Sequence, residues 1–187
     1  MSELAKGYSR AQAALHWLTA ALVVSLAVVG FLMTDAAAES ALRLWLSRAH
    51  VILGAATGAA VVARLALRVR SPKVAPLAMS RPRRALMTAV HAGMYLALLL
   101  VIGSGMGAAL AGEWSAYLPG TGAGAPDLHG LAPREGHERF VLVLLGLVAV
   151  HVAGVVLHEL RLGGALRRMI PRAAAAEEVS STPRARP

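Results

Sequence analysis

The 187-residue chain contains no cysteine, which excludes disulfide bonds, iron–sulfur clusters, thiolate zinc sites and the thioether attachment of c-type haem. A bound metal or haem would have to be held by histidine, methionine or carboxylate side chains. Charged residues are also scarce, at 16% of the chain against about 25% in an ordinary soluble domain. Hydrophobic residues make up 57%, and the mean hydropathy is +0.59. These values exclude an ordinary soluble domain and place the apolar residues in lipid.

Four apolar runs are long enough to cross a membrane, since a spanning helix needs about 20 mostly apolar residues. They predict spans at about 14–33, 49–67, 86–111 and 138–160. The second run includes Arg64, whose long side chain can carry its charge to the membrane surface. The first run exceeds the usual signal-peptide core of about 7–15 residues, so we interpret it as a span. The expected fold is an all-α integral membrane bundle of four transmembrane helices over residues 1–172, followed by a disordered tail, 173–187.

Basic residues are divided unevenly between the connections. The N-terminal arm, the second connection and the C-terminal tail, together with Arg64, hold 15 of the 19 Lys and Arg residues. The other two connections hold Arg43, Arg48, Arg134 and Arg139. Because basic connections favour the cytoplasmic side, both termini and the tail are predicted to be cytoplasmic. Topology thus explains the net charge of +9, and nucleic acid is not expected as a partner.

Six of the seven histidines lie in the predicted spans or at their edges. They are His16, His50, His91, His137, His151 and His158. An imidazole in a bilayer costs free energy unless it is paired or ligated, so these residues are functional candidates. A lone histidine in a span is more often hydrogen-bonded to a neighbouring helix, but six in four spans favour ligation.

The spacing on the fourth span places ligands at two depths. His137 and His151 are 14 residues apart, which puts them within about 40° of one helix face and about 21 Å apart along the axis. Two stacked b-type haems, each with two axial imidazoles from different helices, need such an arrangement. His50 shares the outer depth with His137 and is predicted to pair with it. Spacing leaves the inner pairing open, because four histidines share that depth. They are His16, His91, His151 and His158.

Small residues in the spans would let a flat macrocycle approach the helix backbones. Gly54, four residues after His50, is one example. Pairs such as Gly54 and Gly58 are equally well explained as helix-packing motifs in lipid.

Several short motifs follow one another along the chain. They are Tyr8-Ser9-Arg10 with His16-Trp17, His50 with Gly54, Arg64-Leu65 with Arg68, His91 with Tyr95 and Gly105, His137-Glu138, His151, His158 and Leu166-Arg167-Arg168-Met169-Ile170-Pro171. Their order and spacing, from Tyr8 to about Pro171, resemble the bacterial cytochrome b-561 family of four-helix dihaem membrane cytochromes.

The resemblance implies that the protein binds two haems b. His50 and His137 would ligate the iron of the outer haem, and His16 and His151 that of the inner haem. It leaves the catalytic residues unknown.

Further residues are expected beside the cofactors. The resemblance places His91 and His158 near the inner side, next to the haem or a quinone and not as ligands. Arg10 and Arg64 share the inner haem's depth and could neutralise its carboxylates or orient a quinone carbonyl, or else extend to the membrane surface. Gly54 is also expected to be a haem-binding residue.

The resemblance further implies electron transfer in the respiratory chain of the bacterial inner membrane, between a periplasmic-side donor and ubiquinone. One activity in the family is superoxide oxidation, so an oxidoreductase of the superoxide:ubiquinone type is expected. The outer connections have a net charge of −2, which does not favour attraction of an anion.

The alternative is a haem-bearing anchor subunit that takes electrons from a periplasmic hydrogenase or dehydrogenase. Expected partners are membrane lipid, quinone and either a second copy of the chain or a periplasmic redox protein. A third hypothesis, a metal or proton carrier without haem, predicts no Soret band.

Overall fold

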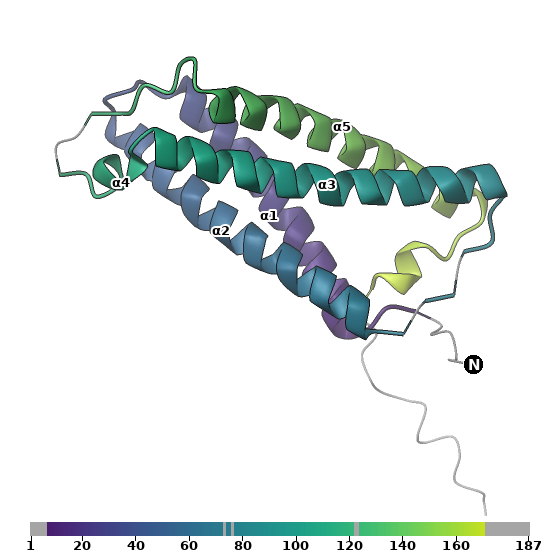
Figure 1. Cartoon of the computed structure of the whole chain (residues 1–187). Coiled ribbons are helices and arrows are strands. Elements are labelled where there is room, and N and C mark those ends of the chain that lie inside the picture. Colours follow the sequence, from purple (N-terminus) through teal and green to yellow (C-terminus); the bar gives the residue numbers. More distant parts are fainter. Residues whose placement is uncertain (1–6, 73, 76, 122–123, 171–187) are drawn as a thin grey trace, which may run out of the picture.

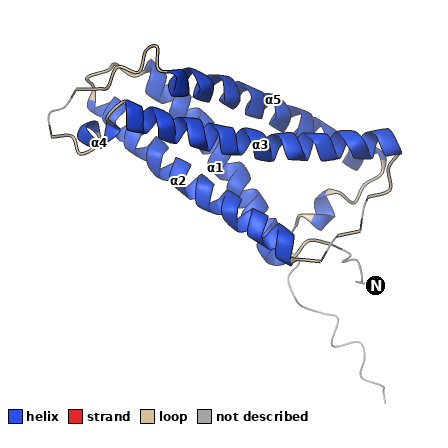
Figure 2. Ribbon diagram, viewed as in Figure 1, coloured by secondary structure: helices blue, strands red, loops and turns tan. Residues whose placement is uncertain are grey.

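The computed structural model describes residues 7–72, 74–75, 77–121 and 124–170. These residues form the long helices α1 (Arg10–Asp35), α2 (Ala41–Arg70), α3 (Arg81–Ala111) and α5 (Ala132–Arg161). A single turn, α4 (Trp114–Tyr117), follows α3, and a 3₁₀ turn, η1 (Leu166–Arg168), follows α5. Every regular element of the described residues is helical (Figure 2), so the predicted all-α fold with four spanning helices is confirmed. The tail predicted at 173–187 lies outside the described residues.

Each long helix extends beyond its apolar run. Ser9 caps α1 by accepting a hydrogen bond from the backbone N–H of Gln12, whose side chain accepts one from the N–H of Ser9. Ser40 caps α2 by accepting one hydrogen bond from the N–H of Arg43. The predicted span at 49–67 is therefore part of one continuous 30-residue helix, and Arg64 lies within it. Hydropathy marks only the lipid-buried part of each helix, because polar residues continue the helices into the interface.

The long helices pack as two antiparallel pairs, α1 with α2 and α3 with α5 (Figure 1). The pairs touch each other at few positions, and α3 diverges from α2 with distance from α4. We call the end that holds Arg10, Arg70, Arg81 and Arg161 the basic end, and the end that holds α4 the opposite end. The first and last long helices thus begin and end on the same side of the bundle.

The best-buried apolar cluster lies between the two ends. It consists of Val61, Ala97, Leu98 and Leu144. Leu144 is seven residues from His137 and seven from His151, so this cluster separates the two depths that the histidines occupy. Apolar side chains such as Leu110 and Leu142 are 78% and 65% exposed, as expected of helices that face lipid.

Candidate functional site

His50 of α2 and His137 of α5 face each other near the opposite end. Their ring centres are 6.1 Å apart, with the ring planes at 74°. The Nδ1–H of His137 donates to the backbone carbonyl of Val101 at 2.9 Å. That bond fixes the tautomer in which Nε2 keeps a free lone pair, the form that binds a metal. The Nδ1 atom of His50 is buried and has no hydrogen-bond partner.

Glycines lie against both rings of this pair. A Cβ at Gly30 would be 3.4 Å from Cε1 of His50, and a Cβ at Gly105 would be 2.9 Å from Cε1 of His137. A Cβ at Gly54, one turn from His50, would meet no atom within 4 Å. Gly30 and Gly105 therefore let the imidazoles approach the helix backbones, whereas space is open beside Gly54.

His16 of α1 and His151 of α5 form a second pair toward the basic end. Their ring centres are 6.3 Å apart, with the planes at 66°. The Nη2 of Arg64 donates to Nδ1 of His16 at 3.2 Å, because an arginine has no acceptor. Metal binding through Nε2 of His16 requires the other tautomer, so it would release Arg64 to another acceptor.

His91 is the third histidine at this depth. Its ring centre lies 4.9 Å from that of His151, edge to face, and its Nδ1–H donates to the carbonyl of Met87 at 2.7 Å. His158 lies seven residues beyond His151, in the last turn of α5, and Arg10 is the exposed first residue of α1. The structure thus brings His91 to the basic-end pair and leaves His158 and Arg10 nearer the membrane surface.

A small cavity with both polar and apolar walls adjoins the basic-end pair. It is lined by Tyr8, Gln12, His16, Arg64, Leu67, Arg68, His91, Tyr95 and Met169. The guanidinium groups of Arg64 and Arg68 lie 5.6 and 6.0 Å from the ring centre of Tyr95. Trp17 closes this region by donating from Nε1 to the carbonyl of Met169 at 2.8 Å. Two cationic donors therefore line a small cavity next to His16.

The spacing within each pair fits one metal ion between two imidazoles. An ion about 2 Å from each nitrogen places the ring centres roughly 6 Å apart. The His16–His151 and His50–His137 pairs meet that condition, while the 4.9 Å between His91 and His151 is too short. In the described residues no three His, Asp or Glu side chains cluster as a metal site. Two nitrogens per site suit a haem iron, whose other four ligands come from the porphyrin.

Sequence reasoning missed how α4 closes the opposite end. Arg48 of α2 donates from Nε to the carbonyl of Leu118 at 2.7 Å and from Nη2 to that of Pro119 at 2.9 Å. These bonds hold the segment after α4 beside the helix that carries His50. The short aromatic motif Trp114-Ser115-Ala116-Tyr117 was the available signal, but four residues carry no helical periodicity.

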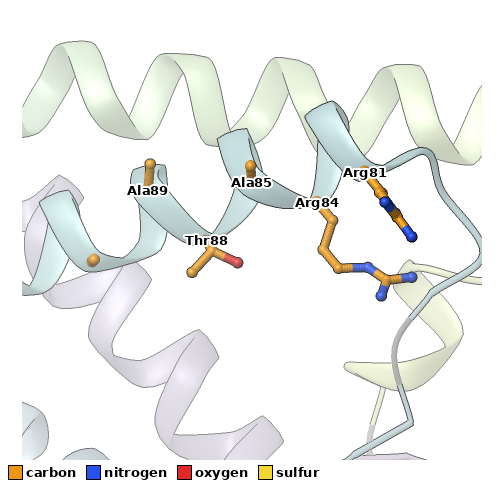
Figure 3. A pocket seen from close by; sticks show the side chains of 6 residues that line it. Arg81, Arg84, Ala85, Thr88 and Ala89 are labelled. Carbon is orange, nitrogen blue, oxygen red and sulfur yellow. The ribbon is translucent and has the colours of Figure 1, made fainter.

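A separate open groove runs along the first turns of α3. Figure 3 shows Arg81 and Arg84 beside the short side chains of Ala85, Thr88 and Ala89. No histidine lines this groove, so it is not part of either histidine site.

Comparison with known proteins identifies one family. Residues 7–172 match the family described as prokaryotic cytochrome b561, which covers both histidine pairs and all four long helices. No curated protein and no solved structure matches the chain.

Proposed function

Because the chain belongs to the prokaryotic cytochrome b561 family, we propose that its two histidine pairs hold two b-type haems that carry electrons across the bacterial inner membrane. The family binds b-type haem and transfers electrons within membranes, and this chain is a multi-pass membrane protein. Bound haem supplies reversible one-electron chemistry, while the protein sets its position and electrostatics. The number of haems, the ligands, the orientation and the substrates are parts of the proposal.

The observation that carries the proposal is the pair of matched ring separations. His50–His137 and His16–His151 have centres 6.1 and 6.3 Å apart, each pair joins two helices, and both pairs include α5. Along α5 the two sites are about 21 Å apart at 1.5 Å per residue. This is the arrangement of two relay sites, one toward each membrane surface.

The charges support an orientation with the basic end in the cytoplasm. Arg10, Arg70, Arg81 and Arg161 all lie there, and Lys and Arg concentrate on the cytoplasmic side of membrane proteins. The sites at His16–His151 and His50–His137 are then the inner and outer haem sites.

We propose that ubiquinone exchanges electrons at the basic end. The cavity beside His16 offers Arg64, Arg68 and Tyr8 as hydrogen-bond donors for a quinone carbonyl or haem carboxylates. Release of Arg64 from His16 would leave its guanidinium free for that role.

The donor is proposed to act at the opposite end, with superoxide as the small-molecule candidate. The arginines near His137 do not form a free cationic patch, because Arg134 bonds Glu138 and Arg139 bonds Glu135. Arg48 is engaged with backbone carbonyls. If a redox protein co-purifies with this chain, the donor is that protein and not superoxide, and the chain is the haem-bearing subunit of a larger complex.

Haem quantification on single-histidine variants tests the ligand assignment. Wild type should contain two haems b per chain, and His50→Ala and His151→Ala should each contain one. His129→Ala, an exposed histidine before α5, is the matched control and should keep two. His91→Ala and His158→Ala should also keep two. A variant of His91 or His158 that loses a haem, or a wild type without haem, contradicts the assignment.

A further inference from the structure

The only buried side-chain nitrogen and oxygen atoms without a hydrogen-bond partner in the described residues gather at the opposite end. They are Nδ1 of His50, Nε1 of Trp114 and the hydroxyl of Tyr117. Leaving a buried donor unpaired costs about 1–3 kcal/mol, so such groups normally have a partner. Three of them at one end of the bundle indicate hydrogen-bonding partners that the described part of the chain does not supply.

Trp114 and Tyr117 belong to α4, and their ring centres are 6.4 Å apart. Glu113, the residue between Gly112 and α4, adopts the left-handed conformation, at φ 53°, which few non-glycine residues do, and so separates α4 from α3. Tyr117 is only 6% exposed. The turn thus directs a phenol into the protein at the end of the bundle.

The position of α4 relates it to both histidines of the opposite-end pair. Arg48, which binds the carbonyls of Leu118 and Pro119, is two residues from His50, about 3 Å along the axis of α2. Gly105, which lies against His137, is six residues before the end of α3, about 9 Å along its axis. The α4 turn therefore lies just outward of the space between His50 and His137.

The indole N–H can only donate, so its missing partner is an acceptor. The carboxylates of a haem are at the edge of the macrocycle, away from the iron, and they accept strong, charge-assisted hydrogen bonds. Among the described residues at this end, Arg43 and Arg48 donate to backbone carbonyls and Arg134 and Arg139 pair with glutamates, so each arginine already has a partner. Neutral aromatic donors remain.

We infer that Trp114 and Tyr117 donate hydrogen bonds to the carboxylates of the haem held between His50 and His137. The inference rests on the proposed haem site at that pair. It makes α4 a positioning element of the site. Because neutral donors disperse the carboxylates' negative charge without cancelling it, they raise the potential of the nearby iron modestly.

The test compares Trp114→Phe, Tyr117→Phe and the double variant with wild type by spectroelectrochemical titration and redox-difference infrared spectroscopy. Each change keeps an aromatic ring and removes the donor. Trp45→Phe is the matched control, because it removes a 65% exposed indole on α2 near the same end and keeps an aromatic ring for Arg48, whose guanidinium lies 4.9 Å from the Trp45 ring centre. The variants should keep two haems. The double variant should lower the reduction equilibrium constant of one haem roughly tenfold, which is about 59 mV for one electron, and shift the carboxylate bands.

The affected haem should be the one that His50→Ala loses, while the other haem and Trp45→Phe should be unchanged. Unchanged potentials and carboxylate bands in the double variant would overturn the inference and assign the donors to water or a solution anion. Equal shifts of both haems would also overturn it. A wild-type protein with fewer than two haems, or a His50→Ala protein that keeps both, would instead refute the proposed function. The two failures are therefore distinguishable.

Discussion

Replacing Gly105 by alanine should weaken haem binding at the His50–His137 pair and spare the other site. The new methyl group would lie 2.9 Å from Cε1 and 3.0 Å from Nδ1 of His137. The imidazole would have to move by roughly half an ångström to restore an ordinary carbon–carbon contact of about 3.5 Å. It cannot do so freely, because its Nδ1–H is bonded at 2.9 Å to Val101 on the same helix as Gly105.

The expected size follows from this clash. Overpacking a fitted site typically costs about 1–3 kcal/mol. If that cost falls on the ligand geometry, haem affinity at this site drops roughly 5- to 150-fold, at about 1.4 kcal/mol per tenfold. Gly103→Ala is the matched control. Gly103 lies on the same helix, and a Cβ there would meet no atom within 4 Å. Both changes carry the same gain in helix propensity, up to about 1 kcal/mol.

The assay is transfer of haem from the purified protein to an excess of apomyoglobin, followed optically. Gly105→Ala should release one haem per chain faster than wild type and the second at the wild-type rate. Gly103→Ala should match wild type in both phases. The reasoning fails if the two variants behave alike, or if Gly105→Ala speeds release of the haem that is lost in His151→Ala.

Three further changes test other contacts. Arg64→Gln removes a positive charge and should lower the potential of the haem that His151→Ala loses by roughly 59 mV, a tenfold change in its reduction equilibrium constant. Arg70→Gln, at the exposed end of α2, should leave that potential unchanged, and potentiometric titration measures both. Trp17→Phe removes the donor to Met169, so trypsin should cut at Arg167 and Arg168 faster with two haems retained, which mass spectrometry would show. Ser9→Ala removes the cap of α1 and should cost about 1 kcal/mol in denaturant unfolding; no change would mean that the cap does not contribute to stability.

Hydropathy was sufficient to predict the fold, because four lipid-length apolar runs leave few alternatives to a helical bundle. The helix ends were less predictable. The fourth span was predicted at 138–160, but α5 begins at Ala132, since Pro133 and the salt-bridged turns after it continue the helix outside the apolar run. Side-chain caps and ion pairs define those ends, and hydropathy does not register them.

Depth along a helix was enough to pair His50 with His137, and the structure brings these rings together. It could not choose among the inner histidines, because spacing fixes rise along one axis but not the rotation of each helix about its own axis. The folded chain turns His16 toward His151 at metal-bridging separation and sets His91 against the edge of the same ring. The contact of Arg48 with the segment after α4 joins residues about 70 positions apart, and no local pattern announces it.

The distribution of engaged and free arginines bears on the direction of electron flow. Both proposed haem sites have the same axial ligands, so differences in potential must come from surrounding charge, hydrogen bonds and burial. Arg64 and Arg68 line the cavity at His16, and a nearby positive charge stabilises the reduced iron and raises its potential. At the opposite end Arg134 and Arg139 are neutralised by glutamates, which leaves Arg48, held by two backbone carbonyls, as the one cation near His50 without a carboxylate partner among the described residues, against two at the cavity. Equal ligation with unequal charge therefore favours electron movement from the His50–His137 site toward the His16–His151 site, which is the direction required if a donor acts at the opposite end and quinone is reduced at the basic end.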